Sequence, residues 1–297
     1  MTKVAVVAHA GKNLGGGLKE LREVLAEAGF PKPAWYEISK SSAAPKYARR
    51  AIRDGADVLF VWGGDGTVQR CVDALADTKA VIAILPAGTA NLLAVNLGVP
   101  ISLSEAVGVG LHGAHRSLDT GTVNGEHFTV MAGAGFDALM IREADKGMKK
   151  RVGRAAYLWT GARNLSAQRV KASITVDGRR YFKGRVSCVL VGNVGKVVGG
   201  VEAFDGASPD DGLLDLGVVT AKNAVQWART LGRAALGKTE KSPFVETAAG
   251  TSFTIRFNQR FPYELDGGAR PAAKKLRIRV HPASITFCVP AEAEPQS

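Results

Sequence analysis

The residues best suited to chemistry in this chain form a glycine-rich turn with one acidic side chain. Residues 58–62 are apolar, Gly63-Gly64-Asp65-Gly66-Thr67 follows directly, and a helical pattern comes next. Glycine lets backbone amides approach an anion closely, and the start of a helix adds partial positive charge. A carboxylate in such a cradle is explained if Asp65 binds Mg²⁺ or accepts a proton from a hydroxyl group. The alternative is an ordinary tight turn.

Two further loops are expected beside this turn. An apolar run at residues 4–7 leads into the loop 9–17, and another at residues 81–85 leads into the loop 86–91. Buried parallel strands need no polar alternation, so these runs predict strands of one parallel sheet. The helical patterns after the three loops cover residues 18–28, 68–75 and 92–97. Open α/β sheets bind ligands at the carboxyl ends of such strands.

The composition is that of an ordinary folded protein. The chain has 297 residues, 46% apolar and 22% charged, which is enough for about two domains. No run approaches the ~18 apolar residues of a membrane span, and the first residues lack the features of a signal peptide. Three widely spaced cysteines fit buried thiols in a reducing cytosol. These features predict a cytoplasmic protein.

A net charge of +12 indicates an anionic partner. Nucleic acid is one candidate, but the chain lacks a recognisable nucleic-acid-binding motif and has no aromatic residues interleaved with the basic ones, so we expect none. An anionic membrane surface is the other candidate. The densest basic run, Lys146 to Arg154, fits either a solvated loop or a peripheral membrane contact.

The second half of the chain has a different pattern. Asn124-Gly125 and Asp177-Gly178 are hairpin signals between alternating runs, which predicts antiparallel β structure. Residues 101–118 read as a helix end plus a connection. Helices are expected near residues 137–145, 154–166 and 223–236, and a disordered tail at 291–297.

Several motifs occur in an order that is similar to the diacylglycerol kinase family of soluble bacterial lipid kinases, whose wider relatives include sphingosine, ceramide and NAD kinases. About twenty residues after the glycine-rich turn comes Leu-Pro-Ala-Gly-Thr-Ala-Asn at 85–91. Residues 133–138 resemble the family's Gly-x-Gly-x-Asp-Ala segment. Residues 210–215 resemble its Asp-Asp-Gly-x-Leu-Asp segment, and 265–267 the start of its closing Asp-Gly-Glu. The ordered set is more specific than any single motif.

The resemblance implies an α/β plus β fold. An N-terminal three-layer, NAD kinase-like α/β domain would bind the nucleotide, and a β-sandwich-like domain would receive the lipid. We predict these domains at residues 1–118 and 119–284, with a strand in 285–297 that returns to the first domain. The resemblance also implies ATP and Mg²⁺ as cofactors and a possible homodimer, which is frequent among related enzymes.

The resemblance assigns candidate nucleotide contacts. The family's first phosphate loop stands here at residues 9–13, where Lys12 could pair with a phosphate or be an ordinary exposed lysine. Thr67 and Thr89 can be helix caps as well as phosphate contacts, and Asn91 is interpreted as a contact rather than a turn residue. The predicted nucleotide-binding residues are His9, Ala10, Gly11, Lys12, Asn13, Ser39, Gly63, Gly64, Asp65, Gly66, Thr67, Gly88, Thr89 and Asn91.

The acidic segment around Asp211 is a predicted structural Mg²⁺ site. Taken alone, this segment would be a surface turn. In the resembling family, the second aspartate and nearby backbone carbonyls bind the ion through ordered water, and this role carries over to Ser208, Asp211 and Leu213.

The chain departs from the family where proton transfer is expected. Gly268 replaces the glutamate of Asp-Gly-Glu, the proposed general base of the soluble bacterial enzymes. Either Asp65 is the base, as in sphingosine-type relatives, or Asp266 takes the role, or catalysis is weak. We favour Asp65. In the helix after the second loop, Leu92 and Val95 stand where the family frequently has Asp and Arg.

The sequence therefore predicts a lipid kinase that acts at the inner face of the membrane. It would transfer the γ-phosphate of ATP to a lipid hydroxyl, with diacylglycerol as the favoured acceptor, and Asp65 and Asp266 are the candidate catalytic residues. One alternative is a kinase for another lipid, a sphingoid or an NAD-like acceptor. The other is a nucleotide- or lipid-binding regulator with weak catalysis, which Gly268 favours.

Overall fold

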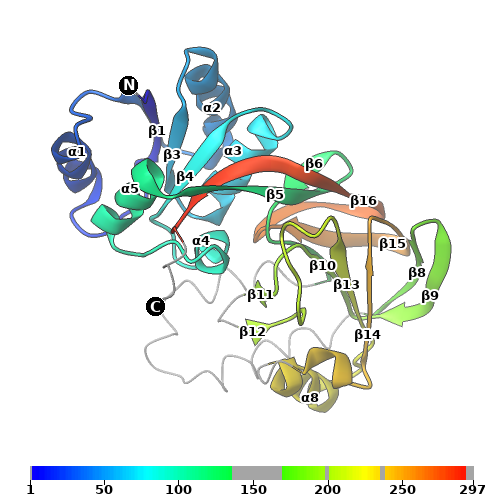
Figure 1. Cartoon of the computed structure of the whole chain (residues 1–297). Helices are drawn as coiled ribbons and strands as arrows, with labels where there is room; N and C mark the ends of the chain where they lie inside the picture. Colours follow the sequence, from blue (N-terminus) through cyan, green and yellow to red (C-terminus); the bar gives the residue numbers. More distant parts are fainter. Residues whose placement is uncertain (1, 136–168, 198–200, 235–237, 292–297) are drawn as a thin grey trace, which may run out of the picture. The chain divides into compact units, whose positions relative to one another are not determined.

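The computed structural model describes residues 2–135, 169–197, 201–234 and 238–291. It divides into two compact units, residues 1–118 with 283–297, and residues 119–282. Each unit is described separately below (Figure 1). The helices expected near 137–145 and 154–166, the basic run Lys146 to Arg154 and residues 292–297 of the tail lie outside the described residues.

The first unit is built on a parallel sheet. Strand β1 pairs with both β2 and β3, β3 pairs with β4, and all these pairs are parallel. The last part of β16 adds a further parallel strand, because Thr286 and Phe287 pair with the start of β4. The strands are β1 (Val4–His9), β2 (Ala34–Ile38), β3 (Val58–Gly63), β4 (Val81–Pro86) and the end of β16 (Gly268–Val289).

Helices connect these strands and cover the sheet. The helices are α1 (Gly17–Glu27), α2 (Ala44–Arg53), α3 (Asp65–Leu75), α4 (Leu92–Asn96) and α5 (Leu103–His112), with a short 3-10 helix η1 (Ser41–Ala43). Helix α1 contacts α5 and α2 contacts α3, and Figure 1 shows the two pairs on opposite sides of the sheet. All residues of β3 are buried, which explains why this strand has no polar alternation. The prediction of an α/β fold with parallel strands is confirmed.

Two elements of the first unit differ from the sequence prediction. The unit β2–α2 was missed, because β2 has partly exposed residues such as Trp35 and Tyr36 and gives no apolar run. Residues 101–118 contain the ten-residue helix α5 rather than a helix end. Two glycines hid this helix in the sequence. One of them, Gly110, packs where a Cβ atom would come within 2.3 Å of the Phe60 ring.

The second unit is mainly antiparallel β structure. Its strands run in the order β14-β13-β10-β7-β15-β16, and β8 pairs with both β15 and β9. The strands not yet given are β5 (Ala114–Val123), β6 (Glu126–Phe128), β7 (Met131–Ala134), β8 (Val170–Val176), β9 (Arg179–Val186), β10 (Cys188–Gly192), β11 (Lys196–Val197), β12 (Val201–Glu202), β13 (Leu214–Val219), β14 (Val245–Gly250) and β15 (Ser252–Leu265).

The described residues of this unit also include a helix, a 3-10 helix and three turns in which two successive residues have positive φ. Helix α8 (Ala224–Ala234) falls in the predicted range and places Trp227 in a small core; a 3-10 helix, η4 (Thr239–Lys241), follows. Both predicted hairpin turns, at Asn124-Gly125 and Asp177-Gly178, have two residues of positive φ. A third such pair, Asp266-Gly267, joins β15 to β16. The predicted β-sandwich-like second domain is confirmed.

Candidate functional site

Two glycine-containing loops of the first unit are in direct contact. Gly64 lies between β3 and α3, and Gly88 follows β4. A Cβ atom at Gly88 would come within 2.4 Å of the Gly64 Cα and 2.6 Å of the Asn91 Oδ1. The backbone atoms leave no room for a side chain, so the loops approach this closely because both positions are glycine. Such loops present backbone amides that can hold an anion.

Asp65 is the first residue of α3 and connects the two loops. Its Oδ1 accepts a hydrogen bond of 2.6 Å from the backbone N–H of Leu92. The carboxylate therefore satisfies an amide at the start of α4. Asp65 is partly exposed, and Gly66 and Thr89 are exposed. The predicted catalytic carboxylate thus also has a structural hydrogen bond.

The side chains of two predicted nucleotide-binding residues form hydrogen bonds within the protein itself. Thr67 is 1% exposed, and its Oγ1 lies 2.9 Å from the Oγ of Ser41. Asn91 accepts a hydrogen bond from the Gly88 N–H at 2.9 Å and donates to the carbonyls of Pro86 and Gly88 at 3.1 and 2.9 Å. These bonds shape the second loop, which is the turn role that the sequence analysis set aside for Asn91.

The loop after β1 approaches the glycine-rich turn. The Cε atom of Lys12 lies 4.0 Å from the position of a Cβ at Gly64, and the Trp62 indole donates to the Lys12 carbonyl at 3.4 Å. His9 accepts a hydrogen bond from the Gly11 N–H at 3.1 Å. Burial and the charge of Lys12 lower the pKa of His9. The structure therefore groups Lys12 with the glycine-rich turn.

The next residues of the same loop have a negative neighbour. The Glu20 carboxylate accepts a hydrogen bond from the Gly16 N–H at the start of α1, and the Oδ1 of Asn13 lies 2.7 Å from the position of a Cβ at Gly17. This helix start is therefore already occupied by a carboxylate. Its acidic cap was not recognised in the sequence.

The remaining predicted contacts lie at the ends of β1 and β2. Ala10 donates a hydrogen bond of 2.8 Å to the Ile38 carbonyl, and the exposed Ser39 follows directly. The Ala10 side chain is a methyl group, and the Ser39 hydroxyl forms no hydrogen bond with the part of the chain that the structure describes, so neither side chain indicates a role.

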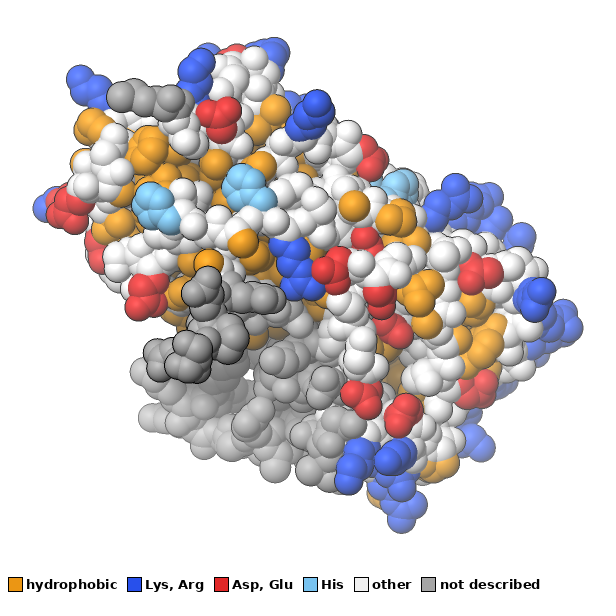
Figure 2. Space-filling model, viewed as in Figure 1, with side chains coloured by type: hydrophobic (Ala, Val, Ile, Leu, Met, Phe, Trp, Pro, Cys, Tyr) orange, Lys and Arg blue, Asp and Glu red, His pale blue; other side chains and the backbone are white. Residues whose placement is uncertain are grey.

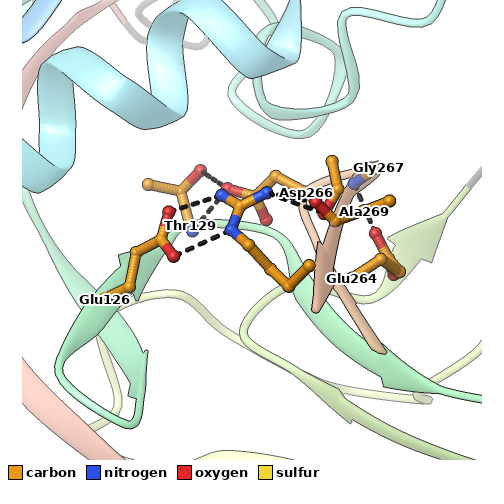
Figure 3. Close-up of polar contacts among 8 residues, drawn as sticks. Glu126, Thr129, Glu264, Asp266, Gly267 and Ala269 are labelled. Atoms are coloured by element: carbon orange, nitrogen blue, oxygen red, sulfur yellow. Dashed lines mark hydrogen bonds and ion pairs between the residues drawn. The ribbon is translucent and has the colours of Figure 1, made fainter. Parts of the chain in front are cut away.

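The second unit places Asp266 in a different kind of environment. Asp266 is 3% exposed, and its two carboxylate oxygens accept four hydrogen bonds of 2.8 to 2.9 Å. Figure 3 shows Asp266 beside Thr129, which supplies two of them. The donors are the N–H groups of Thr129, Val130 and Met131 and the Thr129 hydroxyl. Burial raises the pKa of Asp266, and these donors oppose the rise. The carboxylate joins the β15–β16 turn to the segment before β7.

An arginine occupies the space beside Gly268. A Cβ atom at Gly268 would lie 2.8 Å from the Arg270 Nη1, which donates to the Gly268 carbonyl at 2.8 Å. Arg270 also forms a paired interaction with the Glu126 carboxylate, with 2.8 Å between Nε and Oε2. The Arg270 guanidinium thus contacts both Glu126 and the Gly268 carbonyl of the turn. A cation therefore lies where the family's glutamate would begin.

Glu264 is a buried carboxyl group that the sequence analysis missed. It is 1% exposed, and its Oε2 accepts a hydrogen bond from the Gly267 N–H. Its Oε1 has no hydrogen-bond partner among the described residues. Burial raises the pKa of Glu264 to about 8, further increased by the charge of Asp266. Glu264 is therefore largely a neutral acid near pH 7. The sequence shows a glutamate at position 264 but gives no sign that its side chain is buried.

The predicted metal segment forms a hydrogen-bonded loop. The Ser208 hydroxyl donates to Asp210 at 2.6 Å, and the Asp211 carboxylate accepts from the Leu213 N–H at 2.9 Å. Asp119, another missed residue, accepts a hydrogen bond of 2.7 Å from the Gly212 N–H.

The charges of this loop are compatible with a cation that keeps water ligands. Burial and the nearby Asp211 raise the pKa of Asp215. Within the described ranges, no three Asp, Glu, His or Cys side chains are grouped as metal ligands. A magnesium ion here would thus use Asp211, backbone carbonyls and water, which matches the habit of Mg²⁺ to retain several waters.

Comparisons with protein families agree with this geometry. Residues 3–123 match the diacylglycerol kinase catalytic domain, and residues 130–289 match the YegS C-terminal NAD kinase beta sandwich-like domain. A protein of Pseudomonas savastanoi pv. phaseolicola named "Probable lipid kinase YegS-like" is 30% identical over 258 residues, 84% of this chain and 81% of that protein. A "Diacylglycerol kinase" of Staphylococcus carnosus is 28% identical and covers 89% of this chain and 87% of its own length.

Solved structures share the fold. A diacylglycerol kinase from Bacillus anthracis has a TM-score of 0.77 at 24% identity, covering 97% of this chain and 96% of that chain. An NAD kinase from Archaeoglobus fulgidus has a TM-score of 0.54 at 12% identity, covering 97% and 93%. No described helix is long and apolar enough to cross a membrane.

Proposed function

Because this chain belongs to the family of YegS-like lipid kinases with a diacylglycerol kinase catalytic domain, we propose that it phosphorylates the hydroxyl group of diacylglycerol to give phosphatidic acid. The family implies use of ATP. Diacylglycerol itself is the finer part of the proposal, supported by the order of the sequence motifs and by the similarity to the kinase of Staphylococcus carnosus.

The contact between Gly64 and Gly88 is the observation that best supports phosphate binding. It brings the amide-rich ends of β3 and β4 together, with Lys12 beside them. Loops of this kind bind phosphates through backbone N–H groups, and a lysine adds a positive charge. In phosphoryl transfer most of the rate comes from such positioning and charge neutralisation.

Asp65 is the proposed catalytic carboxylate. One oxygen is bonded to Leu92, and the partly exposed carboxylate lies among the amides that would hold phosphates. It would accept the proton of the attacking hydroxyl or hold the metal ion. Asp266 is less suited to either role, because four hydrogen bonds already occupy its oxygens. We assign it the role of fixing the turn before Gly268.

Mg²⁺ is proposed at two places. With ATP bound, it would neutralise phosphate charge near Asp65. Asp211, with the carbonyls of Ser208 and Leu213, would hold a second, structural ion through water.

A weakly catalytic regulator remains the second candidate. It is favoured by the absence of a carboxylate at 268 and by the guanidinium of Arg270 in that space. A cation there does not accept a proton, so this position supplies no general base.

One assay separates these functions. The protein is incubated with labelled ATP, Mg²⁺ and a mixed lipid extract, and the products are separated by thin-layer chromatography. We expect labelled phosphatidic acid from the wild type and none above background from Asp65→Asn. Asparagine preserves the acceptor for Leu92, so the melting temperature should hardly change. A folded Asp65→Asn protein with normal turnover would refute the role of Asp65. Labelling of a different lipid would show that this lipid, and not diacylglycerol, is the acceptor.

A further inference from the structure

One face of the second unit carries basic side chains that the proposed catalysis does not use. Along residues 275–280 of β16, solvent-accessible basic residues alternate with buried apolar ones. Lys275, Arg277 and Arg279 therefore share one face of the sheet. Figure 2 shows Lys and Arg side chains gathered where β8, β9 and β16 lie in Figure 1.

The strand register extends this basic face across four strands. Lys275 on β16 lies opposite Arg256 on β15, which lies opposite Ser173 on β8. Ser173 in turn lies opposite Lys183 on β9. Like charges placed directly opposite each other on neighbouring strands are destabilising. Arg256 and Lys275 form such a pair without an intervening acid.

The positive charge of this face is not balanced by internal ion pairs. Arg256, Lys275, Arg277 and Arg279 take part in none of the ion pairs found among the described residues. Partial burial and the charges of Arg256 and Arg277 lower the pKa of Lys275. An anion bound at this face would relieve the repulsion.

The face also contains a hollow of about 700 Å³. Hydroxyl groups of Ser252, Thr254 and Thr175 belong to its lining, and Arg277 and Arg279 contribute positive charge. The register places Thr254 opposite Arg277 and Ser252 opposite Arg279, so each arginine lies opposite a residue with a hydroxyl group, and the Ser252 hydroxyl donates to Asp177 at 3.1 Å. Hydroxyls and guanidinium groups are the side-chain donors best suited to phosphate oxygens.

Two hairpin turns hold the edges of the hollow in place. The Asn124 side chain accepts a hydrogen bond from the Arg277 N–H at 3.0 Å and donates to the Lys275 carbonyl at 3.3 Å. The Asp177 carboxylate accepts hydrogen bonds from the N–H groups of Thr251 and Ser252 at 3.0 and 2.8 Å. These bonds fix the backbone of β15 and β16 beside the hollow.

We propose that this hollow is a second anion site, which binds phosphate groups separately from the glycine loops of the first unit. The phosphates come either from phospholipid headgroups or from a soluble phosphorylated compound. Single-stranded nucleic acid fits less well, because base stacking needs an open aromatic face. Phe253, the one Phe, Tyr or Trp residue of the lining, is 2% exposed, and the His281 ring of the lining packs against His127 at 5.0 Å between ring centroids.

The experiment compares two charge-matched variants of the full chain. Lys275→Gln/Arg277→Gln removes two cations from the hollow, and Lys46→Gln/Arg49→Gln removes two exposed cations from α2. Co-sedimentation is measured with vesicles of phosphatidylcholine alone and with added phosphatidylglycerol. In parallel, the melting temperature is measured with and without inorganic pyrophosphate. Without ligand, neither variant should melt below the wild type, because the substituted side chains are accessible to solvent and Lys275→Gln removes a like-charge pair with Arg256.

We expect Lys275→Gln/Arg277→Gln to bind phosphatidylglycerol vesicles or pyrophosphate about 30-fold more weakly than the wild type does. Each basic residue near an anionic surface contributes roughly a factor of five in affinity, and the variant loses two. The α2 variant should lose much less. Loss of binding to phosphatidylglycerol vesicles identifies the headgroup as the source of phosphate. Loss of only the pyrophosphate-induced melting shift identifies a soluble phosphate compound. Equal losses in both variants, no loss in the hollow variant, or no binding of either probe to the wild type would each overturn the proposal.

Discussion

The buried Glu264 should make the stability of the second unit fall as the pH rises. In the folded state its pKa is raised from the ordinary value of 4.5 to about 8 by burial. The unfolded chain releases this proton near 4.5, whereas the folded chain keeps it until about 8. Stability from this group is therefore fully present below pH 4.5 and is lost progressively up to pH 8.

The size of the effect follows from the two pKa values. At ~1.4 kcal/mol per pH unit, the interval from 4.5 to about 8 corresponds to at most ~5 kcal/mol. Between pH 5 and pH 7 the change is ~3 kcal/mol. For a unit of this size, 1 kcal/mol corresponds to about 2–4 °C in melting temperature. We therefore expect a shift of about 5–10 °C that is specific to this carboxyl.

Glu264→Gln tests this reasoning because glutamine keeps the acceptor for the Gly267 N–H but cannot ionise. Melting temperatures of the wild type and the variant are measured from pH 5 to pH 8. The melting temperature of Glu264→Gln should increase relative to that of the wild type as the pH rises. Glu246→Gln removes the same charge from an exposed position on β14 and is the control. A constant difference between wild type and Glu264→Gln over this range would refute the buried neutral acid.

Three further substitutions test other parts of the structure. Gly88→Ala should destabilise the protein by about 1–3 kcal/mol in thermal unfolding and weaken ATP binding, because its Cβ would meet the Gly64 backbone at 2.4 Å; Gly66→Ala, where nothing lies within 4 Å, should leave stability nearly unchanged, and equal losses would contradict the contact. Asp211→Ala should abolish the rise in melting temperature on adding Mg²⁺, because ligand binding stabilises the folded wild type by roughly 2.7 kcal/mol at a hundred-fold excess over Kd; an unchanged rise would show that Asp211 does not bind the ion. Gly268→Glu should not raise turnover on diacylglycerol and should lower stability, because its Cβ would lie 2.8 Å from the Arg270 Nη1; a ten-fold increase without loss of stability would place the base at residue 268.

The parts of the fold that the sequence predicted well are those with a strong local pattern. Strand β3 is a continuous apolar run, and Asn124-Gly125 and Asp177-Gly178 are turn pairs that need positive φ. The pattern failed where tertiary packing decides. The edge strand β2 is half-exposed, and α5 contains Gly110, which is required by close packing against Phe60 rather than by a turn.

The candidate site was predictable in position but not in detail. Motif order located Gly64 and Gly88, and the structure adds that they touch. The local sequence does not show which polar side chains form hydrogen bonds that stabilise the fold. The hydrogen bonds of Asn91 and Asp266, and the burial of Glu264, depend on residues that are distant in the sequence or on the final packing. The positive φ values of the β15–β16 turn belong to Asp266 and Gly267, so the absence of a side chain at Gly268 is not required by its backbone conformation.

The pairing of β16 with β4 has a consequence for folding during synthesis. The first unit contains residues 1–118 but also residues 283–297, so its sheet is incomplete until Thr286 and Phe287 have left the ribosome, after the whole of the second unit. Phe287 and Cys288 contribute fully buried side chains to that unit. Until they arrive, the edge of β4 is unpaired and open to wrong partners. Although it begins before the second unit, the first unit is thus completed after it, and a ribosome that stops before residue 283 releases a chain without a finished first unit.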